Sequence, residues 1–460
     1  MPDVDTLRAT RTFGAWANLD LRKLNTRERV AVITVGILAL AAAGALAFEV
    51  YRRFGAPRNE YDLRIYYSAL NFWHGGNDLY AFSQKDPVNG LLGFTYPPVA
   101  AILMSPMTAL SIRPVVVITS LAILGATVGL VLLSLRERVL LRRPQMVLAT
   151  GFAVAAAFCL QPISQTAAYG QVNTFLALLV MFDIFVLSRR GSRWAGIGIG
   201  LAMAIKLTPA VFLLYLVLSK QWRMLRVSVA TAAAATVVAG VVAPVATWRY
   251  FTSALWDSSR VGVLDNTANQ SLNGTLARFS GAFPPDKILW ALGVVIVVVI
   301  GSVRIHRAVA AGDTLLAVTV TGLLGVLVSP VSWLHHAVWI VPAMVVLFGR
   351  LVTTLPRHRF RPADGGTKLH PEDSRATRRW IGTAVFTAVG LVMFMVNTRN
   401  MFDLPDTGYA DLTLWSRLAG SVQAIWMLAA VMLLPTRTAA DARRLEQRIS
   451  GSPVRARVGS

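Results

Sequence analysis

The feature that most constrains the fold is a series of apolar segments that recur along the chain, several of them about 18 or more residues long. A helix of that length crosses the hydrocarbon core of a bilayer. Within lipid, only helices and closed barrels satisfy every backbone polar group, and these segments are continuous rather than alternating, which excludes a barrel. Hydrophobic residues make up 55% of the chain and its mean hydropathy is +0.55. The sequence therefore predicts an all-α polytopic membrane protein.

We predict about 12 crossings, with short juxtamembrane or re-entrant helices between them. The predicted crossings are 30–48, 115–135, 146–160, 172–187, 194–204, 209–218, 225–245, 288–303, 315–328, 337–351, 381–396 and 414–434. Residues 97–111 are predicted to form a re-entrant or interfacial helix, and residues 194–218 two short passes with a turn at Lys206. Broken helices at membrane depth occur where they line a cavity or are buried in protein, so both places are candidate walls of a site.

The charge pattern sets the predicted orientation. The net charge of +22 arises from Lys and Arg in short blocks between the apolar segments, as in loops that face the cytoplasm. Nucleic-acid binding is the weaker interpretation of this charge. The predicted parts are a cytoplasmic leader 1–29, a transmembrane domain 30–434 with outer loops 51–96, 247–287 and 329–336, and a cytoplasmic basic tail 435–460. We expect a multi-pass plasma-membrane protein with both termini in the cytoplasm.

Asp62 follows the first predicted crossing and is the leading candidate for catalysis. A carboxylate in an outer loop, at the end of a crossing, can act as a general base toward a lipid-borne substrate. The alternative is an ordinary loop acid paired with Arg58 or Arg64. Aromatic residues nearby, among them Tyr66, suit both sugar stacking and anchoring at the membrane interface.

Three further ionisable residues lie at the ends of apolar segments. Lys206 interrupts a long apolar stretch, where a charge is expensive and is expected to be functional or paired, and a cation suits a phosphate. Extension of its amine to the membrane surface is the alternative. His335 and His336 follow a proline at the outer end of a crossing and can bind phosphate or assist proton transfer. They lack a third ligand for a metal, and with Cys159 as the single cysteine no cysteine cluster can form.

Amide side chains gather in two segments that are predicted to lie on the outer side. One segment contains Gln171 and Asn173, and the other contains Asn269 and Gln270. Amides donate and accept hydrogen bonds at once, which matches sugar hydroxyls, although such loops can also simply be solvated. The residues predicted to bind substrate are Lys206, Asn269, Gln270, Tyr66, Tyr96, Gln171, Asn173 and Arg64.

Six motifs between about residues 61 and 339 stand in an order that matches a known family. They are Tyr-Asp-Leu-Arg-Ile-Tyr-Tyr, Tyr-Pro-Pro, Gly-Gln-Val-Asn, Ile-Lys-Leu-Thr-Pro, Asn-Gln-Ser-Leu and Ser-Pro-Val-Ser-Trp-Leu-His-His. In this order the chain resembles the actinobacterial GT-C glycosyltransferases that include the polyprenol-phosphate-mannose-dependent α-(1,2)-mannosyltransferases of phosphatidylinositol mannoside and lipomannan synthesis in the cell envelope.

The resemblance implies a GT-C fold and an extracytoplasmic active site that moves mannose, with inversion, from a polyprenyl-phosphate donor to a glycolipid acceptor. It makes Asp62 the catalytic base, and His335 or His336 a second catalytic or substrate contact, with the choice between them open. Some relatives carry two acids where this chain has the single Asp62, so we expect neither a metal nor another cofactor. Two alternatives remain: an arabinofuranosyltransferase that uses decaprenyl-phosphate arabinose, and a polytopic transporter or flippase.

Overall fold

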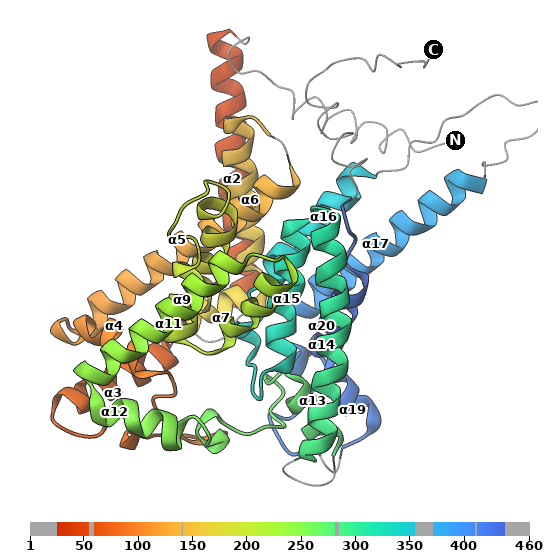
Figure 1. Cartoon of the computed structure of the whole chain (residues 1–460). Coiled ribbons are helices and arrows are strands. Elements are labelled where there is room, and N and C mark those ends of the chain that lie inside the picture. The colour runs from red at the N-terminus through yellow and green to blue at the C-terminus, as the bar shows by residue number, and fades with distance from the viewer. Residues whose placement is uncertain are drawn as a thin grey trace, which may run out of the picture.

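A computed structural model of the chain describes residues 25–54, 59–139, 141–280, 285–354, 371–409 and 412–437. Its regular structure is mostly helical, as predicted (Figure 1). A small antiparallel pair, β1 (Gln84–Asp86) and β2 (Gly90–Leu92), lies in the first long loop. The predicted leader 1–29 and tail 435–460 lie mostly outside the described residues.

Five helices of the described residues are long and apolar enough to cross a membrane. They are α2 (Thr26–Phe54), α5 (Ile112–Arg138), α11 (Trp222–Val242), α14 (Lys287–Ala310) and α17 (Pro371–Met395). Helices α6 (Arg143–Phe158) and α7 (Gln161–Tyr169) make a sixth span if they are counted together, although they are bent by 76°. The structure is that of a polytopic membrane protein, but the predicted count of about 12 crossings is not confirmed.

The predicted number of crossings differs from the number of helices long enough to span a membrane because several of the predicted crossings are short helices. Several other predicted crossings are helical but short: α15 (Thr314–Val328) has 15 residues, α16 (Ile340–Thr353) has 14 and α20 (Val422–Leu433) has 12. At 1.5 Å per residue, a helix of 15 residues reaches about 22 Å, less than the hydrocarbon core of about 30 Å. Apolar sequence alone does not separate such helices from full crossings, because a helix buried within a bundle is also apolar all round.

The remaining elements are short and lie between or beside the long helices. They are α3 (Tyr61–His74), η2 (Leu79–Ala81), α4 (Pro98–Met104), η3 (Ser105–Ala109), α8 (Asn173–Phe182), η4 (Asp183–Leu187), α9 (Ile197–Ile205), η5 (Thr208–Val211), α10 (Phe212–Leu218), α12 (Pro244–Arg249), η6 (Tyr250–Ala254), η7 (Ser258–Val261), α13 (Leu272–Phe279), η8 (Leu334–His336), α18 (Thr398–Met401) and α19 (Leu414–Ala419).

Helix α15 forms the centre of the main core. It packs against α14, α16, α20 and α10, and every residue from Leu315 to Leu327 is buried. Thr319 and Thr321 are buried away from water, but their hydroxyl groups donate hydrogen bonds to backbone carbonyl oxygens one turn earlier in the helix. A short helix can be apolar on all sides here because neighbouring helices, rather than lipid, cover it.

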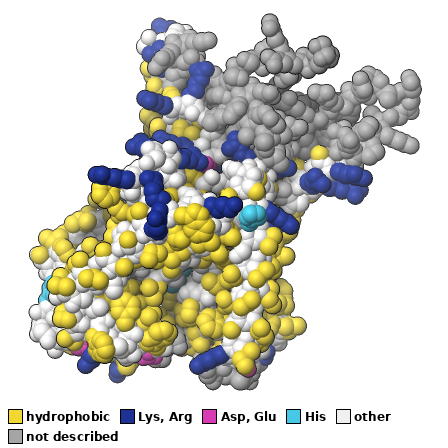
Figure 2. All heavy atoms as spheres, viewed as in Figure 1, with side chains coloured by type: hydrophobic (Ala, Val, Ile, Leu, Met, Phe, Trp, Pro, Cys, Tyr) yellow, Lys and Arg dark blue, Asp and Glu magenta, His cyan; other side chains and the backbone are white. Residues whose placement is uncertain are grey.

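The outer surface is apolar over most of its height. Figure 2 shows hydrophobic side chains over the middle and lower part of the molecule, while most Lys and Arg gather toward the upper part of the view, where Figure 1 labels α2, α6 and α16. Large apolar side chains of the long helices are exposed, including Leu46 on α2 and Val295 on α14. Soluble proteins rarely expose such continuous apolar surface, whereas lipid-facing helices do.

Both predicted irregular places are helical and interrupted. Helix α9 ends at Ile205, Lys206 is extended with φ −151° and ψ 135°, and η5 then starts at Thr208, so the predicted break is confirmed. Helix α4 begins with Pro98 in its first turn and continues into η3, which ends at Ala109. Neither α4 nor η3 is long enough to cross a bilayer alone.

A buried ion pair joins α5 to the start of α15, and it generates a stability prediction. Arg138 donates from Nη2 to both carboxylate oxygens of Asp313 at 2.8 Å, and the two side chains are 6% and 3% exposed. Asp313→Asn leaves the arginine buried without its charge partner, so the free energy of unfolding should fall by about 3–5 kcal/mol. Thermal unfolding of the detergent-solubilised protein measures this loss.

The control variant is Glu137→Gln, on the same turn of α5. Glu137 pairs with Arg189, whose side chain is 52% exposed, so this substitution should cost less than about 1 kcal/mol. Equal losses in the two variants would contradict the assignment of a structural role to the buried pair.

Candidate active site

Asp62 lies in the first turn of α3, where the end of α7 packs against that turn. The contact depends on Gly170, which has a φ of +70° and follows α7 directly. A Cβ at this position would lie 2.6 Å from the Cβ of Leu63, so only glycine permits both the backbone angle and the approach. As a result, the next residue, Gln171, lies beside Asp62.

Gln171 links Asp62 to two tyrosines. Its Nε2 donates to Oδ2 of Asp62 at 2.8 Å and to the hydroxyl of Tyr66 at 2.9 Å. The Tyr66 hydroxyl donates to the Tyr96 hydroxyl, which donates to Oε1 of Gln171, each at 2.9 Å. This closed ring is buried, and a displaced member would leave a buried polar group unpaired, so the ring holds Gln171 against Asp62.

Lys206 extends the network toward α8 and η8. Its Nζ lies 3.5 Å from the Tyr96 hydroxyl, 3.0 Å from Oδ1 of Asn173 and 3.0 Å from Nε2 of His336. The side chain is buried, and no carboxylate lies within salt-bridge distance of it among the described residues. Burial lowers the pKa of Lys206 to about 7, with the charge of Asp62 opposing this fall, so an anionic ligand beside the amine would favour its cationic form.

His336 brings a ring nitrogen to this cation, and the ring of His335 lies beside that of His336, with 4.8 Å between the centroids. An ammonium group only donates, so Nε2 of His336 accepts from Lys206 and the neutral ring carries its proton on Nδ1. Burial and the nearby charge of Lys206 hold the pKa of His336 well below its usual value, which keeps the ring neutral. In the described part of the chain, Nδ1 of His336, Nε2 of His335 and Nδ2 of Asn173 are buried without a hydrogen-bond partner. Such a cluster is typical of a ligand site.

Burial raises the pKa of Asp62 to about 6, and hydrogen bonding from Gln171 and the charge of Lys206 oppose this rise. The side chain is half-buried, and the hydrogen bonds of the described residues involve only one of its two oxygens. The carboxylate is therefore a stronger base than an ordinary aspartate but is still ionised at neutral pH, which is the range that suits a general base.

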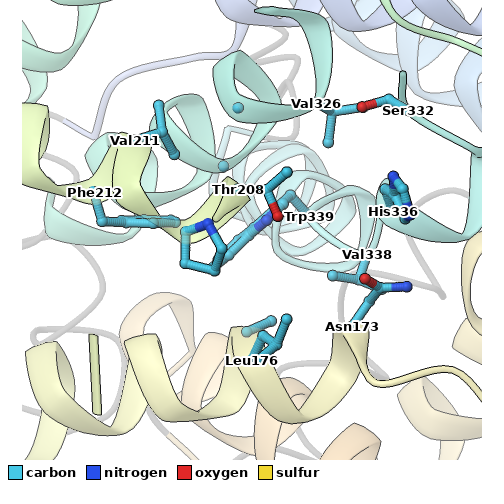
Figure 3. Close-up of a pocket in the computed structure, with 14 residues that line it drawn as sticks. Asn173, Leu176, Thr208, Val211, Phe212, Val326, Ser332, His336, Val338 and Trp339 are labelled. Atoms are coloured by element: carbon cyan, nitrogen blue, oxygen red, sulfur yellow. The ribbon is translucent and has the colours of Figure 1, made fainter. Parts of the chain in front are cut away.

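A pocket, shown in Figure 3, is lined in part by Asn173 and His336, two of the partners of Lys206. Asn173, Ser332 and His336 lie on one side of it, while Val211 and Phe212 lie on the opposite side. Its lining residues are Asn173, Leu176, Ala177, Thr208, Pro209, Val211, Phe212, Gly322, Gly325, Val326, Ser332, His336, Val338 and Trp339. Sequence analysis did not single out Ser332 or Trp339, although both lie in or beside the motif that contains the two histidines.

Asn269 and Gln270 are placed differently from the other candidates. Both are fully buried, and their amide groups bond to the protein itself. Oδ1 of Asn269 accepts from the backbone N–H of Ser332 at 3.0 Å, and Oε1 of Gln270 accepts from the backbone N–H of Ala424 at 2.8 Å. The two amides thus join their loop to the Ser332 segment and to the start of α20, and direct sugar binding by them stays a prediction.

Arg64 is not brought into the network. Its guanidinium donates to the carbonyl oxygen of Asn59 at 3.0 Å and lies 3.6 Å from the carboxylate of Glu60, and the side chain is 52% exposed. The alternative in which Arg64 pairs with Asp62 has no counterpart among these contacts. Arg58, the other partner considered for Asp62, lies outside the described residues.

The geometry combines a carboxylate base, a buried cation and unpaired polar atoms within a bundle of apolar helices. The model of Glycosyltransferase family 87 matches residues 94–330, just over half of the chain. The chain belongs to this family. The matched region includes Gln171 and Lys206, whereas Asp62 lies before it and His336 after it.

Curated relatives extend the similarity beyond the region matched by the family 87 model. A polyprenol-phosphate-mannose-dependent alpha-(1-2)-phosphatidylinositol mannoside mannosyltransferase of Mycobacterium tuberculosis is 32% identical over 86% of this chain and 89% of its own length. Its namesake in Mycolicibacterium smegmatis is 30% identical over 86% of this chain and 88% of its own length. A phosphatidylinositol pentamannoside mannosyltransferase of the same organism is 32% identical over 63% of this chain and 69% of its own length.

These matches confirm the resemblance to mannosyltransferases and show that this family 87 member is a membrane glycosyltransferase. No solved structure matches the chain significantly. Among the described residues, no group of three or more His, Cys, Asp or Glu side chains could hold a metal ion. Independence of the reaction from a metal stays a prediction.

The closed hydrogen-bond ring generates a prediction about the Tyr96 hydroxyl. Tyr96→Phe leaves the Tyr66 hydroxyl proton without its acceptor and leaves Oε1 of Gln171 with only a 3.4 Å hydrogen bond from the backbone N–H of Val172, so the free energy of unfolding should fall by about 1–3 kcal/mol. The matched control is Tyr67→Phe, because that hydroxyl donates to the carbonyl of Leu110 at the surface and should contribute less than about 1 kcal/mol. Thermal unfolding in detergent compares the two, and an equal or smaller effect for Tyr96 would show that the ring is not structural.

Proposed function

We propose that this enzyme transfers mannose from a polyprenyl-phosphate donor to a phosphatidylinositol mannoside type of glycolipid. The names of the relatives support this donor and this acceptor. The observation that carries the proposal is the sequence of contacts from the carboxylate of Asp62, through Gln171 and Tyr96, to the ammonium of Lys206. A base and a buried cation joined in this way suit a transfer that deprotonates an alcohol and releases a phosphate.

In the proposed reaction, an acceptor hydroxyl attacks the anomeric carbon of the donor mannose. Asp62 accepts the hydroxyl proton as the new glycosidic bond forms, and the bond between the anomeric carbon and the phosphate oxygen breaks. The electron pair of that bond leaves with the polyprenyl phosphate. A β-linked donor then gives an α-linked product by inversion, because the nucleophile and the leaving group occupy opposite faces of the carbon. This use of one carboxylate differs from glycosidases, in which a pair of carboxyl groups flanks the bond.

The leaving phosphate is assigned to Lys206 and its neighbours. Lys206 supplies positive charge, while Nδ1 of His336 and Nδ2 of Asn173 supply donors that the protein itself leaves unpaired. Donors held in place before the reaction stabilise developing charge without reorganising, and they act most strongly where water is excluded. His335, whose Nε2 is likewise unpaired, is a second candidate for this contact. These donors allow departure of the phosphate without a metal.

The remaining candidates are assigned positioning roles. Tyr66, Tyr96 and Gln171 orient the Asp62 carboxylate through their ring of hydrogen bonds. Asn269 and Gln270 hold the outer loop against the segment that carries the histidines. In this proposal their effect on sugar binding is indirect.

The proposed setting is the plasma membrane, with several crossings, both termini in the cytoplasm and the active site on the outer side. The accumulation of Lys and Arg toward the end of the molecule where Figure 1 labels α2, α6 and α16 supports a cytoplasmic position for that end (Figure 2). A polyprenyl donor and a glycolipid acceptor are both held in the bilayer, so a site between helices can receive both laterally.

Replacement of the proposed base tests the function directly. Asp62→Asn should lower mannosyl transfer by about 10²- to 10⁴-fold, because a general base typically contributes that much. Membranes that carry each variant are assayed with radiolabelled polyprenyl-phosphate mannose and phosphatidylinositol mannosides, and new glycosidic bonds are counted by chromatography. Glu60→Gln, which removes the carboxylate two residues earlier, should keep nearly full activity.

Two results of this assay would overturn the proposal. Full activity of Asp62→Asn would remove the carboxylate from catalysis. Movement of labelled lipid across the membrane without a new glycosidic bond would identify a transporter, and transfer from decaprenyl-phosphate arabinose in preference to the mannosyl donor would identify an arabinosyltransferase.

The raised pKa of Asp62 predicts the shape of the pH profile. The base must be ionised, so kcat/KM should fall about tenfold per pH unit below a pKa of about 6, rather than below the usual value near 4. Gln171→Met removes a hydrogen bond that favours the ionised carboxylate, so the acid limb should move to higher pH. Glu60→Gln should leave the limb in place. A limb near pH 4 in the unaltered enzyme would contradict the assignment.

A further inference from the structure

We propose that the pocket lined by Leu176, Phe212, Val326, Val338 and Trp339 binds the isoprene units nearest the phosphate of the donor. This inference rests on the proposed function, because it takes the donor phosphate to lie beside Lys206. Beyond that function, it assigns a binding site to the start of the donor's lipid chain.

The polar side of the pocket is continuous with the proposed phosphate site. Asn173 and His336 both contact Nζ of Lys206, and both also line the pocket. Ser332 lines the same side, is 1% exposed, and has an Oγ without a hydrogen-bond partner among the described residues. Three side chains therefore present unpaired polar atoms where the pocket meets the cation (Figure 3).

The rest of the pocket is mostly apolar. Valine, leucine, phenylalanine and tryptophan side chains line it. Gly325 of α15 keeps this space open: a Cβ there would lie 2.9 Å from Cγ1 of Val211, which lines the pocket as well. A ligand with one anionic end and an apolar body fits such a lining.

Two arguments identify the donor chain, rather than an acyl chain of the acceptor, as the occupant. In the donor, the phosphate joins the sugar directly to the first isoprene unit, so the chain has to begin next to the phosphate site. In a glycolipid acceptor, sugar and inositol rings separate the acyl chains from the reacting hydroxyl.

The second argument is the position of the pocket relative to the base. Contacts run from Asp62 through Gln171 and Tyr96 to Lys206, and the pocket begins beyond Lys206, at Asn173 and His336. Inversion requires the attacking hydroxyl and the leaving phosphate on opposite faces of the sugar. A chain that departs from the phosphate on the side away from Asp62 enters this pocket.

Photolabelling tests the proposal. The probe is polyprenyl-phosphate mannose with a diazirine in its first isoprene unit, added to membranes that contain the full-length protein. After irradiation, mass spectrometry should find the label on peptides that contain Leu176, Phe212 or Val326. A phosphatidylinositol mannoside with a diazirine at the start of an acyl chain serves as the comparison, and it should label other peptides.

A pair of matched variants adds a kinetic readout. Val211→Trp places a large side chain at the half-buried rim of the pocket and should raise the KM for the donor by about tenfold or more while leaving the KM for the acceptor unchanged. The control is Val217→Trp, because Val217 lies on α10, is 40% exposed and does not line the pocket. Ser332→Ala should also raise the donor KM, without lowering the temperature of unfolding, because the hydroxyl it removes has no partner in the protein.

The outcomes separate this inference from the proposed function. Asp62→Asn should lose transfer but keep the labelling pattern, so the label reports binding independently of catalysis. Label from the donor probe outside the pocket, label from the acceptor probe inside it, or an unchanged donor KM in a folded Val211→Trp protein would each overturn the inference. Failure of the unaltered enzyme to transfer mannose would overturn the function instead.

Discussion

The buried ammonium of Lys206 is the constraint on which the site depends. A charge inside an apolar bundle is costly unless polar groups surround it, and here the partners are a tyrosine hydroxyl, an amide oxygen and an imidazole nitrogen, all neutral. These dipoles stabilise the cation without neutralising it. Burial lowers the pKa of Lys206 to about 7, so an anion bound beside the amine would favour its positive charge, and the surrounding donors that lack protein partners can serve the same anion.

Gln171 and Tyr96 matter because they keep Asp62 and Lys206 from pairing directly. A direct salt bridge would lower the pKa of the carboxylate and would occupy the cation, so neither group would be suited to its proposed task. With an amide and a phenol between them, the charges still interact, but burial dominates and the pKa of Asp62 rises to about 6. Because Gln171 and Tyr96 separate Asp62 from Lys206, one network can contain both a base and an anion site.

Sequence analysis identified most members of this network but not their relationships. Asp62, Lys206 and the two histidines are conspicuous because ionisable residues are rare among apolar segments. The hydrogen-bond partner of Asp62 is Gln171, 109 positions away, and nothing local in the sequence indicates such a contact. Ser332 was missed for a related reason, since an unpaired buried hydroxyl is recognised only once the surrounding side chains are placed.

The short helices that leave the predicted number of crossings unconfirmed also account for the existence of the site. Asp62 lies in the first turn of α3, Gln171 lies between α7 and α8, Lys206 lies between α9 and η5, and His336 lies between α15 and α16. Each is at an end or a break, where backbone groups are not paired within a helix and side chains can point toward one another. A bundle made only of full-length crossings would have no such interior ends. The short helices that hydropathy counts as spans are therefore what allows four distant segments to meet around one cation.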